Sequence, residues 1–352
     1  MSSFSPAANQ NLDLSPILGG QLEQFNLEAL DSLSFTDWVW RAVNGELDIS
    51  LGGISEWVFR TFFNELWLNI SLIQQLLLIA VISAIIRCLS DSFKTKSVSE
   101  LGFYVSYVMI VATIFASFRV SAGILTNLVV QATTMMEASI PLMLSLNAMS
   151  GNISSAALLN PILFMGMALM SRFIAHVFIP IVTAAAVLHI VNQLVEGEIF
   201  SKAVSLMKKG SMLALKFMVF LFLTLLALQK LSAPIVNNLA LRTARAAAGA
   251  VPVVGGALNS AMDTVINLSS AARSGVLVAL IIVICIAVSI PLLKLLSFMF
   301  IYKTIAALIQ PICDSRIVNC LDGLGDFVGM LLGAGVLVSV MFIFTCIILL
   351  SF

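Results

Sequence analysis

The sequence contains few charged residues for its length. Only 10% of its 352 residues are Asp, Glu, Lys or Arg, whereas 60% are hydrophobic, and the mean hydropathy is +1.07. Soluble domains contain about 25% charged and about 45–50% apolar residues, and a soluble fold of this size cannot bury such an apolar excess. A soluble globular protein is therefore excluded. Several apolar runs reach the roughly 20 residues that a helix needs to cross a bilayer, so we predict an all-α, polytopic transmembrane bundle surrounded by lipid.

Motifs for catalysis and cofactor binding are also missing. His176 and His189 are the only histidines, and no H-E-x-x-H, G-x-S-x-G or G-x-x-x-x-G-K-[ST] motif occurs. Residues 323–326 have the G-x-G-D form of aspartyl intramembrane proteases, but the Tyr-Asp pair that supplies their second acid is absent from the sequence. We interpret this fragment as a loop that enters the last span. We expect no enzymatic activity, no cofactor and no metal.

The five cysteines do not form a disulfide framework. Cys88, Cys285 and Cys346 lie in or beside apolar runs, where cysteine usually behaves as a small hydrophobic residue. Cys313 and Cys320 are seven residues apart, which matches no zinc-binding spacing. We therefore expect free thiols.

Acidic residues are concentrated near the start of the chain. Residues 1–65 contain nine acidic residues and only two basic ones, Arg41 and Arg60, whereas the rest has an excess of Lys and Arg. Because Lys and Arg favour the cytoplasmic side, we predict an acidic extracytoplasmic region at 1–65 and a multi-span membrane domain at 66–352. Aromatic residues predict an interfacial amphipathic helix at about 53–65, with a small packed subdomain as the alternative. The first twenty residues do not resemble a signal peptide, so either a signal has been removed or the first span directs insertion.

We predict about seven spans, with limits of five and nine, including interrupted or re-entrant helical hairpins. The run at 156–193 is too long for one span and contains Pro161 and Pro180, so it suits two short or broken spans. The predicted apolar segments are 66–86, 101–118, 121–137, 156–193, 211–228, 275–302 and 327–350.

The basic segments do not fix the topology. Basic residues follow the first span at 87–96 and occur again at 202–209. With the N-terminus outside, the first group lies inside, but two spans in 156–193 would place the second group outside, against the positive-inside rule. The conflict disappears if 121–148 also crosses, or if half of 156–193 is re-entrant. The sequence leaves both alternatives open.

One segment, LRTARAAAGAVPVVGGALNSAMDTV, interrupts the membrane body with polar and helix-breaking residues. Arg242 and Arg245 lie three apart, on one side of a helix, and Gly255 and Gly256 follow before Asp263. Broken backbone at membrane depth is tolerated where it is buried in protein or lines a water-filled cavity. We predict half-helices that line a polar pathway, with the arginines facing water or a partner. An ordinary surface hairpin is the alternative.

A second interrupted polar hairpin is predicted near the C-terminal end. Residues 304–326 are amphipathic and loop-like, and their helical character stops at Pro311. Lys294 follows Pro291 by three residues, so a bend there would orient its side chain into the bundle. Lys294 and Lys303 complete the set of candidate pathway or interface residues.

Two further basic residues, Arg172 and Lys216, lie inside or beside apolar runs. A charge at mid-membrane is costly, so it normally faces the bundle interior or extends to the interface. We interpret both as residues that extend to the interface.

These motifs resemble a known family. The segments LRTARAAAGAVPVVGGALNSAMDTV, KLLSFMFIYKTIAALIQPI and NCLD are similar to the stage III sporulation protein AE family of endospore-forming bacteria. The NGE segment, Trp57 and the IPLMLSL segment after Glu137 also match, so the resemblance covers residue 42 to the end. The N-terminus departs from the pattern, because family members generally begin with a signal peptide.

The resemblance implies a role rather than a reaction. Members are membrane subunits of the channel, or feeding tube, that connects the mother cell with the forespore, in a secretion-like complex. It implies a permease- or export-gate-like role in the mother-cell membrane, with other stage III sporulation membrane subunits and a cytoplasmic ATPase as partners. It leaves a homo-oligomer open, and we expect no nucleic-acid partner. The competing hypothesis is a self-contained secondary transporter of a small metabolite or ion.

Overall fold

The protein is described here from a computed structural model. The described residues are 51–93, 96–149, 164–194, 199–249 and 284–351. They are almost entirely helical and contain no strand, which confirms the predicted all-α class. Five of the described helices are long and apolar enough to cross a membrane, and a sixth crossing results if the bent pair Ser55–Leu68 and Ile70–Ile86 is one span. This number lies within the predicted limits and below the predicted seven.

The described helices have the following order along the chain. They are α3 (Leu51–Leu68), α4 (Ile70–Phe93), α5 (Lys96–Met149), the helix Phe164–Leu194 with α7 (Ile179–Leu194) as its last part, α8 (Ser201–Gly249), the helix Ile284–Ile309 and α10 (Ser315–Ser351).

Two helices are much longer than the bilayer is thick. At about 1.5 Å per residue, the 54 residues of α5 extend about 81 Å and the 49 residues of α8 about 74 Å, against about 30 Å of hydrocarbon. The predicted segments 101–118 and 121–137 are therefore parts of one helix, and Pro141 does not end it. This correction is one reason for the smaller number of spans.

The predicted pair of spans in 156–193 is also a single helix in its described part, Phe164–Leu194. A π-helical turn at Ile174–Phe178 precedes Pro180, and the Ile179 N–H bonds to the Ile174 carbonyl. Proline has no N–H and its ring clashes with the carbonyl four residues earlier, here that of His176. The wider π turn accommodates this clash, so the helix continues where a break was predicted.

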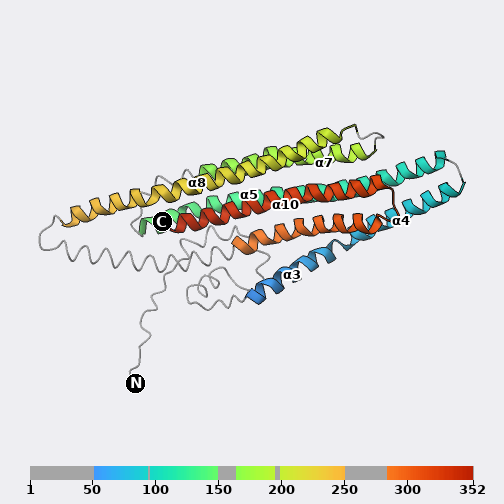
Figure 1. Cartoon of the computed structure of the whole chain (residues 1–352). Helices are drawn as coiled ribbons and strands as arrows, with labels where there is room; N and C mark the ends of the chain where they lie inside the picture. Colours follow the sequence, from blue (N-terminus) through green and yellow to red (C-terminus); the bar gives the residue numbers. More distant parts are fainter. Residues whose placement is uncertain (1–50, 94–95, 150–163, 195–198, 250–283, 352) are drawn as a thin grey trace, which may run out of the picture.

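α3 and α4 run in the same direction, and from α4 on the described helices run alternately in opposite directions (Figure 1). The end of α4, the start of α5, the end of α7, the start of α8 and the turn before α10 all lie at one end of the bundle, which we call the basic end. Arg87 and Lys96 lie near this end, as do Lys202 and Arg316. Because α5 and the helix Phe164–Leu194 each contain a single candidate span, the basic segments 87–96 and 202–209 share one end, and the conflict with the positive-inside rule disappears.

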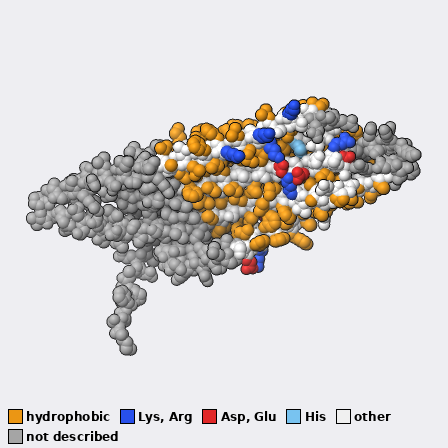
Figure 2. Space-filling view, in the orientation of Figure 1, with side chains coloured by type: hydrophobic (Ala, Val, Ile, Leu, Met, Phe, Trp, Pro, Cys, Tyr) orange, Lys and Arg blue, Asp and Glu red, His pale blue; other side chains and the backbone are white. Residues whose placement is uncertain are grey.

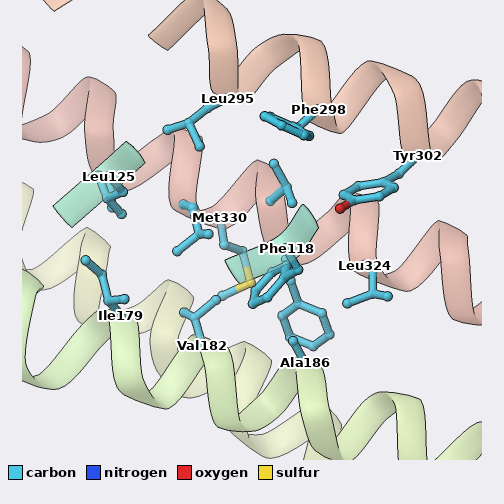
Figure 3. Close-up of a cluster of buried hydrophobic side chains, with 14 of the residues drawn as sticks. Phe118, Leu125, Ile179, Val182, Ala186, Leu295, Phe298, Tyr302, Leu324 and Met330 are labelled. Atoms are coloured by element: carbon cyan, nitrogen blue, oxygen red, sulfur yellow. The ribbon is translucent and has the colours of Figure 1, made fainter. Parts of the chain in front are cut away.

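The bundle is held together by an apolar core. Its members include Phe118 from α5, Val182 from α7, Tyr302 from the helix Ile284–Ile309, and Leu324 and Met330 from α10 (Figure 3). Buried residues of α4 and α8 also belong to this core. α10 packs against both α5 and α7, and more than half of its span is buried, more than in any other described span. α10 is therefore the central helix of the described bundle.

The outside of the bundle is also apolar. Hydrophobic side chains cover much of the described surface, and most of the visible charged side chains gather in one region nearer the basic end (Figure 2). Large hydrophobic residues such as Leu213, Phe220 and Met165 are exposed. An apolar exterior is unfavourable in water and matches a lipid environment, which agrees with the predicted membrane class.

Candidate functional site

A cluster of charged side chains joins three helices near the basic end. Asp326 of α10 accepts hydrogen bonds from Lys208 of α8 (2.5 Å) and from Lys303 of the helix Ile284–Ile309 (2.6 Å). Lys303 also donates to Asp322 of α10, at 2.7 Å. Asp326 and Asp322 are four residues apart, so they lie on one side of α10. The two lysines and two aspartates have no net charge, and Asp326 connects α8 with the helix Ile284–Ile309 through α10.

Two glycines of α10 make room for this cluster. A Cβ atom at Gly325 would lie 3.1 Å from the Lys303 side chain, and one at Gly323 would lie 2.0 Å from Nε2 of His189. Small residues at a membrane helix interface allow close approach of neighbouring helices. The G-x-G-D fragment is therefore a packing motif within α10, and the prediction that it is a loop is wrong, because the helix begins at Ser315.

His189 extends the cluster toward α7. Its Nε2 lies 3.1 Å from the Asn319 carbonyl oxygen, and its ring packs on Phe327 at a centroid distance of 5.9 Å. The ammonium of Lys208 lies 5.9 Å from the centroid of the same Phe327 ring. The apolar Phe327 thus separates the charged cluster from the hydrophobic part of α10 that follows.

The cluster lies at the level where the charged ends of the helices meet their apolar parts. With a rise of about 1.5 Å per residue, Lys208 is about 10 Å from the start of α8, and Lys303 is about 9 Å from Ile309. Beyond Asp326, α10 contains no further charged residue up to Ser351. All four charged side chains are partly exposed, as expected at a membrane interface.

A second ion pair lies deeper in the bundle. Lys294 Nζ is 3.8 Å from Glu65 Oε1, and Glu65 is buried, with 8% of its surface exposed. Glu65 belongs to the last turn of α3, and Asn69, between α3 and α4, donates its side-chain N–H to the Glu65 carbonyl at 2.8 Å. The two helices are bent by 49° at this break. The pair therefore fixes the bend of α3 to the helix Ile284–Ile309.

The structure brings some of the predicted site residues into these clusters. Lys303 belongs to the charged cluster, and Lys294 forms the deeper pair. Arg242 and Arg245 lie on α8 beyond its span, which ends at Leu228, in a helix that continues to Gly249. Their side chains are not described. Gly255, Gly256 and Asp263 lie outside the described residues, so their predicted pathway role stays a prediction.

Sequence reasoning missed several members of these clusters. In the sequence, Asp326 stands out only as the last residue of the G-x-G-D fragment, and Lys208 only as part of a basic segment. Glu65 is the last acidic residue before the first span, and only this position in the sequence could have pointed to it as a site residue. The amphipathic helix predicted at 53–65 is present as α3, although its position at the interface stays a prediction.

The arrangement fits the positioning of helices better than covalent chemistry. Both oxygens of Asp326 are occupied by lysine ammonium groups, so the carboxylate is not free to act as an acid or base. Among the described residues, no group of three His, Cys, Asp or Glu side chains could hold a metal ion. Cys88, Cys285, Cys313 and Cys320 are not joined in disulfides, as expected.

Comparison with known proteins gives two matches. The family model for stage III sporulation protein AE matches residues 33–352. The chain is also 30% identical over 302 residues to stage III sporulation protein AE of Bacillus subtilis (strain 168), an alignment that covers 85% of this chain and 75% of that protein. No solved structure matches the chain.

Proposed function

Because the chain belongs to the stage III sporulation protein AE family, we propose that it is a membrane subunit of the channel complex that connects the mother cell with the forespore. In this role it acts as a permease-like or export-gate-like core in the mother-cell membrane. The family match over residues 33–352 carries the proposal, because the matched region contains all the described spans.

The charged cluster supports a gating or positioning role within such a complex. Asp326 connects three helices at one membrane interface through two lysines. A charge network shared by several helices fixes their relative positions, and a partner that competes for one lysine would change those positions. The cluster therefore supplies a site at which binding can be coupled to a movement of α8 or of the helix Ile284–Ile309.

The proposal also includes the orientation of the bundle in the mother-cell membrane. Both basic segments lie at the basic end, and Lys and Arg favour the cytoplasmic side. This supports a basic end in the mother-cell cytoplasm, where an ATPase partner would bind, and an acidic N-terminal region on the extracytoplasmic side. The ends of α5 and α8 then extend to the extracytoplasmic side, where the channel would continue toward the forespore.

Complementation in sporulating cells tests the proposal. In a strain that lacks the chain, we expect late forespore gene expression to fail and the wild-type chain to restore it. Asp326→Asn removes the charge that both lysines share, so we expect weaker restoration than with Asp322→Asn, which removes only one contact of Lys303. Arg242→Glu with Arg245→Glu tests the predicted pathway segment. Immunoblots establish equal amounts of each variant in the membrane.

Normal spore formation in the strain without the chain would contradict the channel role. Solute movement by the purified protein alone in liposomes, driven by an imposed ion gradient, would instead support a self-contained secondary transporter. If the double arginine variant restores late gene expression fully, the pathway role of Arg242 and Arg245 is wrong, while the membrane subunit role still stands.

A further inference from the structure

The spans contain a marked imbalance of charge. Lysine or arginine occurs in all five spans, whereas their only acidic residues are Asp322 and Asp326. These two are paired with Lys208 and Lys303. Lys294 is paired with Glu65 from outside the five spans. The described chain therefore has no acid left in its spans for a further lysine.

Lys216 of α8 is such a lysine. It lies in the interior of the span Ser201–Leu228 and is exposed, and no acidic side chain among the described residues pairs with it. It is eight residues beyond Lys208, so it lies about 12 Å deeper in the membrane than the charged cluster. The four-carbon stem of lysine covers only part of that distance, so extension to the interface leaves the ammonium in a poorly hydrated position.

An open strip of α10 lies at the same depth. Lys208 and Asp326 are in contact, and α8 and α10 both run away from the basic end, so Lys216 is level with Gly333, about 10 Å beyond Asp326. A Cβ atom at Gly333 would meet no atom within 4 Å. Gly333 belongs to a row spaced by three or four residues along α10, all exposed or half-buried: Asp322, Asp326, Gly329, Gly333, Val336, Val340 and Phe344.

The neighbouring side of α8 continues this surface. Met212, Val219 and Leu223 follow Lys208 at helical spacing and are 42%, 39% and 57% exposed. We define the α8–α10 strip as Met212, Lys216 and Val219 together with Gly333, Val336 and Val340; Gly329 is left out because Met299 already packs against it. It combines a glycine, which allows close approach of another helix, with large apolar side chains and one cation that has no acidic partner among the described residues.

We propose that the α8–α10 strip binds a transmembrane helix of another protein that carries a carboxylate at the depth of Lys216. The need of Lys216 for a negatively charged group identifies the kind of molecule that binds to the strip. Lipid tails supply no counter-charge at this depth. A second copy of the chain in the same orientation has its span acids at the level of Asp326, and its Glu65 is buried against Lys294. This inference does not depend on the channel proposal, because it requires only a partner helix with this chemistry.

Site-specific photocrosslinking in intact membranes tests the inference. The photoreactive residue p-benzoylphenylalanine replaces Val336 on the strip, and in a control chain it replaces Met165, which is exposed on a different helix. We expect an adduct from Val336, and not from Met165, with one membrane protein whose crosslinked span contains Asp or Glu. Mass spectrometry of the adduct identifies that span.

Variants of Lys216 then test the charge. An interhelical polar contact in a membrane is typically worth a roughly three- to tenfold change in association, so Lys216→Leu should lower the adduct yield by that factor. Lys216→Arg should keep the yield near the wild-type value. Lys202→Leu is the matched control, because it removes a lysine of α8 at the interface and should leave the yield unchanged. Replacing the partner's carboxylate by its amide should reproduce the effect of Lys216→Leu.

Several results would overturn the inference. An adduct whose yield is the same with Lys216→Leu would show that the cation does not select the partner. The strip would have a different occupant if the adduct formed with a second copy, with lipid alone, or with residues 250–283 of the same chain. If it formed with residues 250–283, Asp263→Asn should lower the adduct yield. The absence of any adduct at Val336 would mean that the strip faces lipid. None of these results would affect the complementation test of the channel role.

Discussion

At the residue scale, the charged cluster depends on the absence of side chains as much as on the charges. Gly325 leaves space for the stem of Lys303, and Gly323 leaves space for the ring of His189. A larger residue at Gly325 would press on the Lys303 stem and one at Gly323 on the His189 ring, so these side chains or the helix would have to shift. The glycines and the aspartates of α10 therefore contribute together to the charged cluster.

This relation gives a prediction for Gly323. In Gly323→Ala the new methyl group would lie 2.0 Å from His189 Nε2, so the histidine or the helix must shift. Overpacking of this kind costs about 1–3 kcal/mol, and we expect a lower unfolding temperature of the purified protein in detergent. Adding His189→Ala should recover part of the loss.

The same helix offers a matched control. A methyl group at Gly333 meets open space, and alanine favours a helix over glycine by about 1 kcal/mol. Gly333→Ala should therefore unfold at the wild-type temperature or slightly above it. Equal unfolding temperatures for the two alanine variants would contradict the packing role of Gly323.

At the scale of elements, the bend between α3 and α4 is held by one ion pair whose carboxylate is buried. Glu65 lies at the end of α3, and its partner Lys294 comes from a helix more than two hundred residues later in the chain. A buried carboxylate without its partner is strongly unfavourable, whereas loss of both charges is tolerated better. The position of α3 thus depends on electrostatics as well as on apolar contacts.

We predict a characteristic pattern for variants of this pair. Lys294→Met leaves Glu65 unpaired and should destabilise the protein by about 1–3 kcal/mol, less than for a fully buried pair because Lys294 is partly exposed. The double variant with Glu65→Gln should recover much of that loss. Thermal unfolding in one detergent measures both effects.

The exposed pair of α3 serves as the control. Arg60 and Glu56 are 3.4 Å apart, one helical turn from each other, and both side chains are largely exposed. Such a pair contributes about 0.3–0.5 kcal/mol, so Arg60→Met should change the unfolding temperature very little. If Arg60→Met and Lys294→Met have the same effect, the special role of the buried pair is wrong.

At the scale of the whole molecule, the single crossings of α5 and of the helix Phe164–Leu194 decide the topology. They bring 87–96 and 202–209 to the same end. The start of α3 and the distal end of α8 then point away from the basic end. This arrangement agrees with the positive-inside rule without a re-entrant segment.

Cysteine accessibility tests this topology. In a variant without the native cysteines, Ser92→Cys and Ser205→Cys should react with a membrane-impermeant maleimide only from the cytoplasmic side. Ser145→Cys and Ala247→Cys, near the far ends of α5 and α8, should react only from the opposite side. Labelling of positions 92 and 205 from opposite sides would contradict the single crossings.

Much of this protein follows from its sequence alone. The membrane class, the all-α architecture and the approximate positions of most spans were predicted correctly, because the free energy of moving a residue from water to lipid depends mainly on its own side chain and adds along a run. The helix at about 53–65 and the absence of a disulfide between Cys313 and Cys320 were also predicted. Breaks were predicted less well, because Pro141 and Pro180 favour helix ends locally but packing and a π turn keep the helices continuous.

The tertiary structure alone decided which charges meet. Asp326 pairs with Lys208 and Lys303, and Glu65 with Lys294, because the relative register and rotation of helices from distant parts of the chain set those distances. No local pattern encodes that register: it results from the combined packing of many apolar side chains around α10. The same packing leaves Lys216 without an acid among the described residues, which a count of charges along the sequence could not show.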